Sequence, residues 1–559
     1  MNAPPLRRPW RGLLLLWLAA LLLDLWGIQQ GPLRDWDESL VARVALELSR
    51  KPWPDLLLPS QWGAPYLNKP PGAHWLIAAL IQLWRQSTGM APEALPPDWL
   101  IRLAPAVGSS LLAPLLALVQ WQLRPGRRGD ALWTSAIVLT LLPLARHAHL
   151  AMLDGLQLTA MAALWLGVLL ASSRGRGSLA GGLLAGLAAT ALLLLKAPVA
   201  LPVLLVALAL RWADRDLSRQ AWSWLLLGLS LGLLPGLAWH GWHLAWRGDD
   251  ALVMWGRQGL ARVASSIENH GGGPLPPLIQ VITGGWPWLL LWPLGISRAW
   301  RERSSRWGRW VLSLSILASL MVLPLQTQLP WYSLLLWPPF ALACAPVMTA
   351  LIAGDLAPTL QQGIGRIWLL LGVLVLTMAG LSATLPALTE LQPAAGLTLP
   401  AGLGMIVAGV VFGGSFPRRR QAAWGLVIGW GTALLLLFST PLWNWELNER
   451  PSITPLQPLV SRAGRSGALA DLPLLVEGSI GKRPSLRWYA EEPLGKERKR
   501  LLKRWRNRGA LLLVSQASTP ERSDLAGKVG MERVNASSCW LERRGEAGWN
   551  RWQCRWTAQ

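Results

Sequence analysis

Two adjacent carboxylates and one lysine are the residues in this sequence whose types and spacing could do chemistry. Asp37 and Glu38 share a polar segment with Lys69, which precedes Pro70-Pro71. One carboxylate of such a pair can accept the proton of a hydroxyl while the other orients a partner. The prolines hold the chain extended, so the lysine sits on a rigid loop suited to a phosphate oxyanion. These residues predict a site for group transfer from a phosphate to a hydroxyl.

The same residues also allow a purely structural interpretation. A helix expected over 39–50 would place Asp37 and Glu38 at its N-terminus, where acids are favoured by the helix dipole. Lys69 could equally extend from a membrane interface with its stem in the apolar phase. The spacing leaves these alternatives open beside the catalytic one.

Further polar residues stand at the ends of apolar runs. Asp154 closely follows an Arg- and His-rich stretch over 146–149, so a local ion pair is the alternative to a catalytic acid. Lys196 ends a leucine run and carries the same two interpretations as Lys69.

The loop 246–276 carries Arg262 and His270 before Gly271-Gly-Gly-Pro274. The glycines permit backbone mobility, so a moving lid is one interpretation. His270 could contact a donor or a metal ion, or be a solvated loop histidine. The loop has no phosphate-loop lysine, which argues against a nucleotide site of that kind.

The composition shows what must position these residues. The chain of 559 residues is 52% hydrophobic and 15% charged, whereas soluble domains carry about 25% charged residues. Its apolar residues form runs long enough to span a bilayer, which predicts a polytopic α-helical membrane protein. The net charge of +23 does not indicate nucleic acid, because the arginines lie mostly in short loops between the runs. Three cysteines without CxxC or HxxxH spacing predict neither a disulfide scaffold nor a dedicated metal site.

We expect about 13 transmembrane helices, the first of them retained because no cleavage site follows it. The segment 72–85 is too short for a crossing and predicts an interfacial or re-entrant helix. The predicted spans are 12–28, 100–123, 131–148, 153–171, 179–195, 198–211, 222–245, 276–297, 309–326, 331–351, 366–385, 397–416 and 422–441.

The basic loops favour this count. With a cytoplasmic N-terminus, every arginine cluster then falls on the cytoplasmic side, as the positive-inside tendency requires. The candidate site residues fall on the opposite, external face. The clusters are Arg124/Arg127/Arg128, Arg174/Arg176, Arg211/Arg215/Arg219, Arg298/Arg301/Arg303/Arg306/Arg309 and Arg418/Arg419/Arg420.

We therefore expect a membrane domain over 1–444, whose first external loop is 29–99, and a small extracytoplasmic α/β domain over 445–559. That tail is basic, which favours anionic lipids or glycans nearby, although a merely soluble basic domain is the alternative. Its Cys539 and Cys554 could form a bridge in an oxidising exterior. Its expected elements are strands over Leu472–Val476 and Ala510–Ser515 and helices over Pro484–Tyr489 and Glu497–Arg506.

Together these motifs resemble the lipid-A aminoarabinose transferases and their relatives, which are related to the protein O-mannosyltransferases within the GT-C glycosyltransferase superfamily. The order and spacing in the first external loop carry most of the resemblance, and the match covers nearly the whole chain. The matching positions are Asp37-Glu38, Glu47-Leu48, Trp53-Pro54, the segment from Gly63 to Pro71 that includes Tyr66, then Trp75, Asp154, Lys196, Arg262, Pro287-Trp288, Leu329-Pro-Trp-Tyr332 and Pro484–Tyr489.

The resemblance implies an inverting sugar transfer from a polyprenyl-phosphate donor to a lipid, glycan or protein acceptor at the outer face of the membrane. Asp37 would be the general base or acceptor-orienting group with Glu38 in support, and Asp154 a second essential acid. The phosphate-contacting lysine maps to Lys69. Donor contacts are implied for Tyr66, Lys196, Arg262 and Tyr332, and His270 is a further candidate donor contact from its place in the loop 246–276.

Two positions depart from the family pattern. Many relatives have a glutamate, in a position linked to metal contact, where Asn68 stands, and a basic residue where Gln328 stands. We therefore assign neither a cofactor nor that extra phosphate contact, and a divalent metal is left as an alternative.

We expect a monomer in a bacterial inner membrane, surrounded by membrane lipids and without a nucleic-acid partner. The competing hypothesis is a transporter or flippase of lipid-linked sugars, for which internal repeats and polar residues at mid-membrane would be expected. The polar residues here cluster at helix ends instead, and no repeat is evident.

Overall fold

The structure is a computed structural model of the chain. It describes residues 10–34, 36–92, 94–172, 175–256, 261 and 273–443, and in the tail 474–477, 484, 488, 511–515, 538–545 and 548–555. The chain forms two compact units. Unit 1 comprises Met1–Gln30, Leu67–Leu76 and Arg102–Trp443, and unit 2 comprises Gly31–Tyr66, Ile77–Ile101 and Asn444–Gln559.

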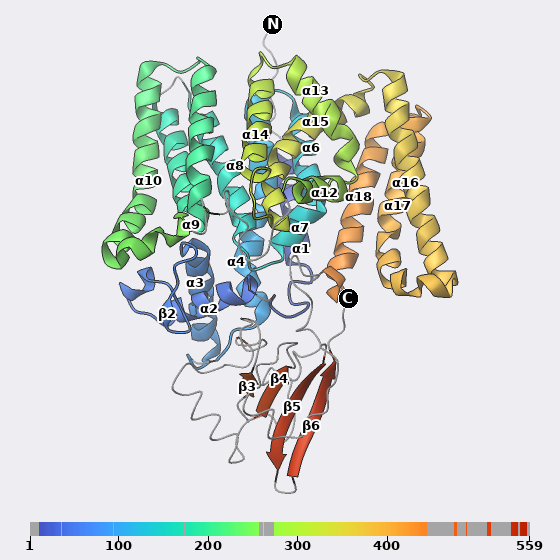
Figure 1. Cartoon of the computed structure of the whole chain (residues 1–559). Coiled ribbons are helices and arrows are strands. Elements are labelled where there is room, and N and C mark those ends of the chain that lie inside the picture. Colours follow the sequence, from blue (N-terminus) through green and yellow to red (C-terminus); the bar gives the residue numbers. More distant parts are fainter. Residues whose placement is uncertain are drawn as a thin grey trace. The chain divides into compact units, whose positions relative to one another are not determined.

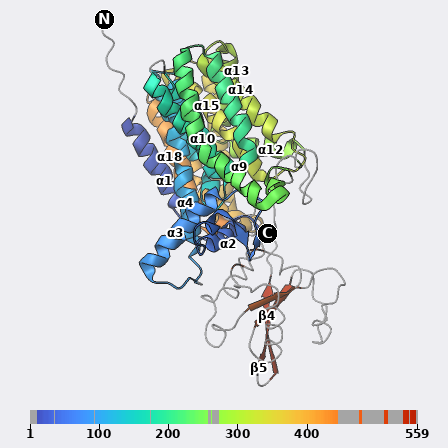
Figure 2. The same ribbon diagram turned by 90° about the vertical axis from the view of Figure 1, so that its left-hand side faces the viewer.

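Long apolar helices build unit 1 and run side by side as a bundle (Figures 1 and 2). The helices that precede the Lys196 region are α1 (Trp10–Leu25), α4 (Asp98–Ser110), α5 (Leu112–Leu123), α6 (Arg128–Thr140), α7 (Leu142–Ala148) and α8 (Asp154–Leu170). They are followed by α9 (Gly175–Ala213), α10 (Arg219–Arg247), α12 (Leu275–Gly284), α13 (Trp292–Arg301), α14 (Arg306–Val322), α15 (Trp337–Ala353), α16 (Pro358–Thr384), α17 (Gln392–Gly413) and α18 (Arg419–Phe438).

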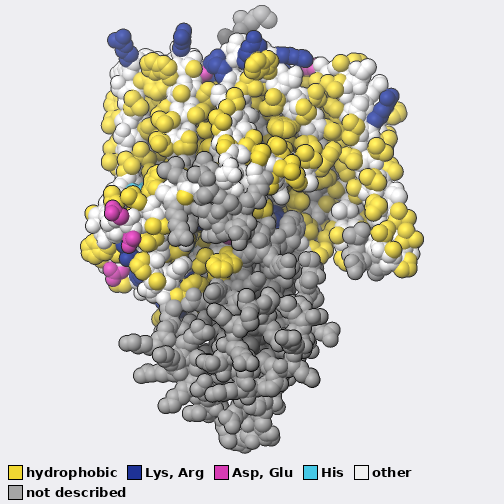
Figure 3. Space-filling view, in the orientation of Figure 1, with side chains coloured by type: hydrophobic (Ala, Val, Ile, Leu, Met, Phe, Trp, Pro, Cys, Tyr) yellow, Lys and Arg dark blue, Asp and Glu magenta, His cyan; other side chains and the backbone are white. Residues whose placement is uncertain are grey.

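Burial separates a central helix from peripheral ones. In the span that contains α15, 78% of the residues in the most apolar window are buried within the structure, against 22% for α16. Leucines on the outer helices stay exposed (Figure 3). Such apolar exposure is stable in lipid, where every backbone polar group is satisfied inside a helix. Unit 1 is thus an integral membrane bundle organised around α15.

Among the described residues, seven helices are long and apolar enough to cross a membrane, and up to nine if two bent pairs each form one span. The predicted count of thirteen stays a prediction. The predicted and observed numbers of spans differ partly because some helices are short: α1, α8 and α14 have 16, 17 and 17 residues. The helix α3 (Gly72–Thr88), which covers the segment predicted not to cross, is not among these spans.

Two predicted spans are broken rather than straight. The span 131–148 is the pair α6 and α7, bent by 65°, and the span 276–297 includes α12 and a second helical segment bent by 109°. Prolines explain both breaks, because a proline removes a backbone donor and cannot continue the preceding helix. Pro143 opens α7, and Pro287 lies in the second break.

The helix α9 is a hairpin with its turn at Lys196. This residue has non-helical angles (φ −151°, ψ 78°) inside the helix. A straight helix would carry residue 211 about 50–60 Å from residue 175 at 1.5 Å per residue. Instead, the Arg211 guanidinium donates to the carbonyl of Ala171 at 2.9 Å, just before α9 begins. The two legs therefore return to the same end of unit 1 and match the separate predicted spans 179–195 and 198–211.

Glycines allow the first leg of α9 to lie directly against α10. A Cβ atom at Gly186 would come within 2.3 Å of the Leu229 carbonyl oxygen, and one at Gly182 within 2.2 Å of the Leu225 oxygen. Small residues at this spacing permit such close backbone approach in membranes. The predicted packing motif Gly182-xxx-Gly186 therefore holds the helix that presents Lys196.

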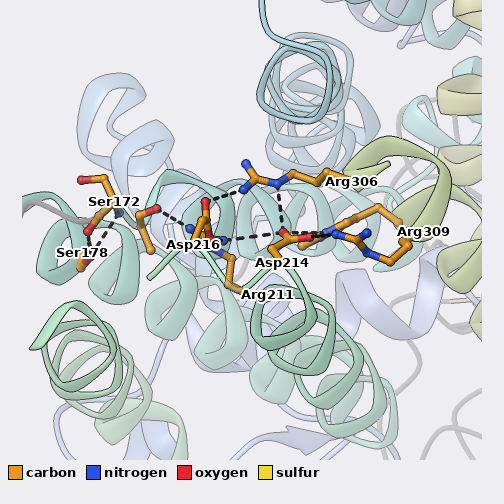
Figure 4. Close-up of polar contacts among 9 residues, drawn as sticks. Ser172, Ser178, Arg211, Asp214, Asp216, Arg306 and Arg309 are labelled. Carbon is orange, nitrogen blue, oxygen red and sulfur yellow. Dashed lines mark hydrogen bonds and ion pairs between the residues drawn. The ribbon is translucent and has the colours of Figure 1, made fainter. Parts of the chain in front are cut away.

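Ion pairs join several of the predicted cytoplasmic arginine clusters at one end of unit 1 (Figure 4). Asp214, which is 1% exposed in its side chain, accepts from Arg309 at 2.7 Å and pairs with Arg306 at 3.0 Å. Arg211 and Arg306 both contact Asp216. At the same end, basic side chains stand along the edge over α10, α13 and α14 (Figure 3), and the sequence there has arginines only.

A similar contact joins a third arginine loop to these clusters. Arg124 pairs with Asp130 at 3.1 Å and with Glu302 at 3.3 Å. The clusters after α5 and after α13 are therefore neighbours, as a common cytoplasmic face would require.

Unit 2 contains helix and strand elements of the first predicted external loop and of the tail. The elements of unit 2 include α2 (Glu38–Leu48), β1 (Ser60–Gln61), β2 (Ala64–Pro65), β3 (Leu474–Glu477), β4 (Leu511–Ser515), β5 (Ser538–Gly545) and β6 (Gly548–Arg555). The four strands of the tail form a sheet of order β3-β4-β5-β6, in which β3 and β4 are parallel and the remaining pairs are antiparallel.

The two apolar runs predicted as strands in the tail coincide with β3 and β4 to within a few residues. The predicted helix 497–506 lies outside the described residues, and of 484–489 only Pro484 and Trp488 are described, both helical. The register of β5 and β6 sets Cys539 opposite Cys554. The bridge between them, and the α/β domain as a whole, stay predictions.

Candidate active site

The turn of the α9 hairpin carries the first element of the site. The Lys196 ammonium donates to the Asp154 carboxylate at 3.0 Å, across 42 residues of sequence. Asp154 begins α8 and is 6% exposed, whereas the Lys196 side chain is 29% exposed. A carboxylate held at a helix N-terminus and bonded to an ammonium remains charged at little cost. The pair thus fixes a cation that still reaches solvent.

This pairing is long-range, whereas the sequence offered a local partner. Arg146 donates to the Trp443 carbonyl at 3.1 Å. His149 bonds the carbonyls of Ala145 and Trp26 at 2.8 and 2.9 Å. His147, by contrast, is close enough for its charge to act on Asp154. The stretch 146–149 therefore serves mainly to hold α7 against its neighbours.

Two other predicted residues lie beside this pair. The Lys196 ammonium sits 5.0 Å from the ring centroid of Tyr332, a distance that allows a cation–π interaction. Lys69 is near enough for its positive charge to act on the Asp154 carboxylate. The structure therefore brings together Lys69, Asp154, Lys196 and Tyr332, with more positive than negative charge. Such a cluster is suited to an anionic group such as a phosphate.

The backbone explains how the Lys69 loop reaches the hairpin. A Cβ atom at Gly72 would lie 2.7 Å from the Leu194 carbonyl oxygen, so only glycine lets the chain after Pro71 approach the α9 turn so closely. Trp75 then packs edge-on against Trp239 of α10 at 6.3 Å between ring centroids. The Lys-Pro-Pro motif and the Lys196 turn are thereby fixed to each other.

His74 shares this neighbourhood but stays neutral. It is fully buried, and burial first and the charge of Lys69 second lower its pKa from 6.5 to about 3. A neutral imidazole adds no positive charge beside Lys69. His74 therefore adds nothing to the positive charge of Lys69 and Lys196.

Asp37 and Glu38 lie in unit 2, at the start of α2. The Glu38 carboxylate is fully buried and accepts the backbone N–H of Arg34 at 2.9 Å. Ser39 closes the same turn by donating to the Arg34 carbonyl at 2.8 Å. Trp36, in between, has a left-handed φ of 59°. Glu38 thus stabilises the turn, while Asp37 occupies the N-cap position without a side-chain capping bond.

Tyr66, predicted as a donor contact, is 3% exposed. Burial chiefly, and the negative charge of Asp37 in addition, raise the pKa of its phenol. Its hydroxyl is therefore a neutral group in the field of Asp37. Glu47 also has a clear task, because it accepts from Arg43 at 2.6 Å and from Ser60 at 2.7 Å and so ties α2 to the β1–β2 hairpin.

Sequence reasoning missed Arg102, which is fully buried near the start of a predicted span. It donates to the Ile28 carbonyl at 3.0 Å and lies 5.4 Å from the Trp443 ring centroid. A charged residue inside an apolar run is itself a signal of a functional or structural role. Here it anchors the chain just before the first external loop begins.

The remaining predicted residues, Arg262 and His270, lie outside the described part of the chain. In that described part, no group of three or more His, Cys, Asp or Glu side chains is arranged to hold a metal ion. Gln328, which replaces a basic residue of the family pattern, donates to the carbonyls of Val322 and Leu325 at 3.0 and 2.9 Å and closes the end of α14.

No protein-family model matches the chain. The undecaprenyl phosphate-alpha-4-amino-4-deoxy-L-arabinose arabinosyl transferase of Pectobacterium carotovorum subsp. carotovorum (strain PC1) is 29% identical over 425 residues, which are 72% of this chain and 70% of that protein. The transferase of the same description from Pectobacterium atrosepticum is 32% identical over 164 residues, 28% of each chain.

Solved structures agree with this similarity. ArnT from Cupriavidus metallidurans in the apo state has a TM-score of 0.65 and 18% identity, over 90% of this chain and 93% of that one. The same protein bound to undecaprenyl phosphate has a TM-score of 0.65 and 17% identity, over 97% of each chain. At such identities the likeness concerns the fold.

Fold and sequence together indicate the class: the chain is a membrane-embedded glycosyltransferase that is similar to proteins of the GT-C type. Within that class it resembles the lipid-A aminoarabinose transferases, as its motifs predicted.

Proposed function

We propose that the chain transfers a sugar from a polyprenyl-phosphate donor to a hydroxyl or phosphate of a lipid, glycan or protein acceptor, with inversion, at the outer face of a bacterial inner membrane. The observation that carries the proposal is the cluster of Lys196, Asp154 and Tyr332, with Lys69 acting on the same carboxylate. The related transferases are named for an undecaprenyl phosphate donor, which supports this donor class.

The chemistry is a single displacement. The acceptor oxygen attacks the anomeric carbon, and the bond between that carbon and the phosphate oxygen breaks. A hydroxyl acceptor passes its proton to the Asp37 carboxylate, whereas an ionised phosphate acceptor attacks without losing a proton. Polyprenyl phosphate departs with the bonding electrons. Lys69 and Lys196 bind the phosphate and stabilise the charge that grows on it, which is where preorganised cations contribute most.

The other residues take supporting roles in this proposal. Asp154 is the second essential acid, and it holds the Lys196 ammonium in place. Tyr332 makes a cation–π contact with that ammonium, and Tyr66 lies in the electric field of the Asp37 carboxylate. Glu38 fixes the turn that presents Asp37. Arg262 and His270 remain predicted donor contacts. The proposal uses no metal step.

A transporter of lipid-linked sugars is the less favoured alternative, because the relatives that the chain matches are transferases. A turnover assay separates the two. Purified full-length protein in lipid nanodiscs, given a polyprenyl-phosphate aminopentose and lipid A, is expected to release free polyprenyl phosphate. Asp37→Asn and Lys69→Met are each expected to lower the rate by about 10²-fold or more.

Arg219→Gln is the matched control, since this exposed arginine begins α10, a helix whose other end lies toward the hairpin turn. It removes one charge and should leave the rate unchanged. Full turnover in folded Asp37→Asn and Lys69→Met protein would refute the site, and absence of product with every acceptor class would refute the transferase proposal.

A further inference from the structure

A cavity lies in unit 1, among the arginine-bearing helix ends and away from the Lys196 turn. It has a volume of about 340 Å³ and lies between α6, α15 and α18. Residues of the first turns of α6 and α18 stand beside the last turns of α15 around it. The proposed transfer reaction uses none of these residues.

Two arginines from different helices line the cavity. Arg128 begins α6, and Arg420 lies in the first turn of α18. Both are exposed, and 292 residues of sequence separate them. Guanidinium groups match phosphate oxygens in charge and geometry. The open N–H groups of a first helical turn favour an anion at the same place.

The inner wall of the cavity is apolar and aromatic. Trp133 and Trp424 face each other with ring centroids 4.9 Å apart, and Leu132 lies beside them. Tryptophan is the residue that membrane proteins favour at the boundary between headgroups and acyl chains. A ligand with an anionic head and an apolar body fits this lining better than a fully soluble ion.

A buried carboxylate close to the cavity does not oppose an anion. Asp130 is buried and pairs with Arg124 at 3.1 Å, and Thr349, which lines the cavity, hydrogen-bonds it. Its charge is therefore compensated from the other side. The cavity keeps the positive potential of Arg128 and Arg420.

We propose that this cavity binds the phosphate headgroup of an anionic phospholipid of the surrounding bilayer, with an acyl chain against Leu132, Trp133 and Trp424. Basic pockets between transmembrane helices on the cytoplasmic side are typical sites for such headgroups. The site is separate from the donor site, because Arg128 and Arg420 belong to the arginine clusters and Lys196 to the opposite end of the α9 hairpin. A bound lipid would join the three helices.

The test compares lipids and charge variants of the full-length protein. Wild-type protein is delipidated, mixed with phosphatidylglycerol or phosphatidylcholine, and analysed by native mass spectrometry. We expect the wild type to retain phosphatidylglycerol. The double variant Arg128→Gln/Arg420→Gln should bind this lipid at least about tenfold more weakly. Inorganic phosphate at millimolar concentration should not displace the lipid, which separates a membrane source from a soluble one.

The control is Arg127→Gln/Arg418→Gln, which removes the same net charge from neighbouring residues outside the cavity lining. It should retain the lipid. Thermal unfolding in phosphatidylcholine verifies that both double variants are folded. Equal binding of the two lipids, equal loss in both double variants, or displacement by inorganic phosphate would overturn the proposal.

Discussion

At the scale of single residues, the candidate site depends on a cation that is held by one partner yet open to another. Lys196 reaches solvent while Asp154 is nearly buried. Removing one member of such a pair leaves the other with an unbalanced charge, which costs about 3–5 kcal/mol for fully buried pairs. The part of Lys196 that is exposed reduces this cost. The same exposure is what a phosphate-binding role requires.

A double-mutant cycle measures whether Asp154 acts through Lys196. Lys196→Met is expected to lower turnover by about 10²-fold, because one stabilising charge at the departing phosphate is lost. Asp154→Asn should lower it less, since the ammonium stays but is displaced. If Asp154 positions Lys196, the double variant should be no slower than Lys196→Met. Rates of polyprenyl phosphate release give the answer, and strictly additive losses would show that Asp154 acts independently.

His74 predicts how stability depends on pH. The folded protein holds its pKa near 3, through burial and the charge of Lys69, against 6.5 in the unfolded chain. Between these values the unfolded state binds the proton and the folded state does not, so stability is complete above pH 6.5 and is lost as pH falls toward 3. Thermal unfolding followed by intrinsic fluorescence at pH 7 and pH 5 should show this loss.

The variant His74→Gln isolates the contribution of His74 to the pH dependence of stability. Its melting temperature at pH 7 should be similar or slightly lower, and its fall between pH 7 and pH 5 should be smaller than in the wild type. An unchanged slope would mean that other groups cause the acid sensitivity.

The sequence singled out candidate site residues by their types but could not predict their partners. Asp154, Lys196 and Lys69 could be selected because charges at the ends of apolar runs are costly and therefore informative. The ion pair between Asp154 and Lys196 could not, because it joins residues 42 positions apart. The helix-start alternative for Glu38 also gains support, since its carboxylate bonds the Arg34 backbone.

At the scale of helices, close packing between α9 and α10 sets the position of the hairpin turn. The predicted small-residue motif pointed to such packing, but not to its partner. The partner glycines are Gly228 and Gly232 of α10, whose added Cβ atoms would lie 2.3 Å from the Leu179 oxygen and 2.6 Å from the Leu183 oxygen. The separate predicted spans 179–195 and 198–211 agree with the reversal of α9 at Lys196. Neither pattern nor length could show that two other predicted spans bend sharply.

Gly186 and Gly241 form a matched pair that tests this packing. An added Cβ atom at Gly186 would come within 2.3 Å of a backbone oxygen, whereas one at Gly241, exposed on α10, meets nothing within 4 Å. Gly186→Ala should therefore destabilise by about 1–3 kcal/mol through forced separation of the helices. Gly241→Ala should be neutral or slightly stabilising, because alanine favours a helix.

The readouts are the melting temperature in detergent and the rate of sugar transfer. Gly186→Ala should lower both, since the displaced leg carries Lys196. Equal melting temperatures for the two variants would contradict the role assigned to the close approach.

At the scale of the membrane bundle, unit 1 separates two kinds of charge along its length. The arginine clusters meet at one end, where Arg211 contacts Asp216 and Arg124 contacts Glu302. Lys196 lies about 20 Å along the second leg of α9 from Arg211, at 1.5 Å per residue. The sequence anticipated this separation from the positive-inside tendency alone. It could not anticipate the acidic residues that bind the arginines together.

The orientation of unit 1 across the membrane predicts which helix ends can be labelled from outside the cell. Ser304 is exposed in the arginine-rich loop between α13 and α14, and Asp250 is exposed just after α10, whose last turns lie toward Lys196. In a Cys539→Ser/Cys554→Ser background only the buried Cys344 remains. Cysteine is then placed at residue 250 or 304.

A membrane-impermeant maleimide applied to spheroplasts should label Asp250→Cys, and should label Ser304→Cys only after permeabilisation. The reason is that lysine and arginine are retained on the cytoplasmic side during insertion, so the Arg298–Arg309 loop stays inside and the Lys196 turn faces out. Labelling of Ser304→Cys in intact spheroplasts would show that unit 1 has the opposite orientation in the membrane. It would place Lys69 and Lys196 in the cytoplasm, and the donor sugar would then have to be bound from that side.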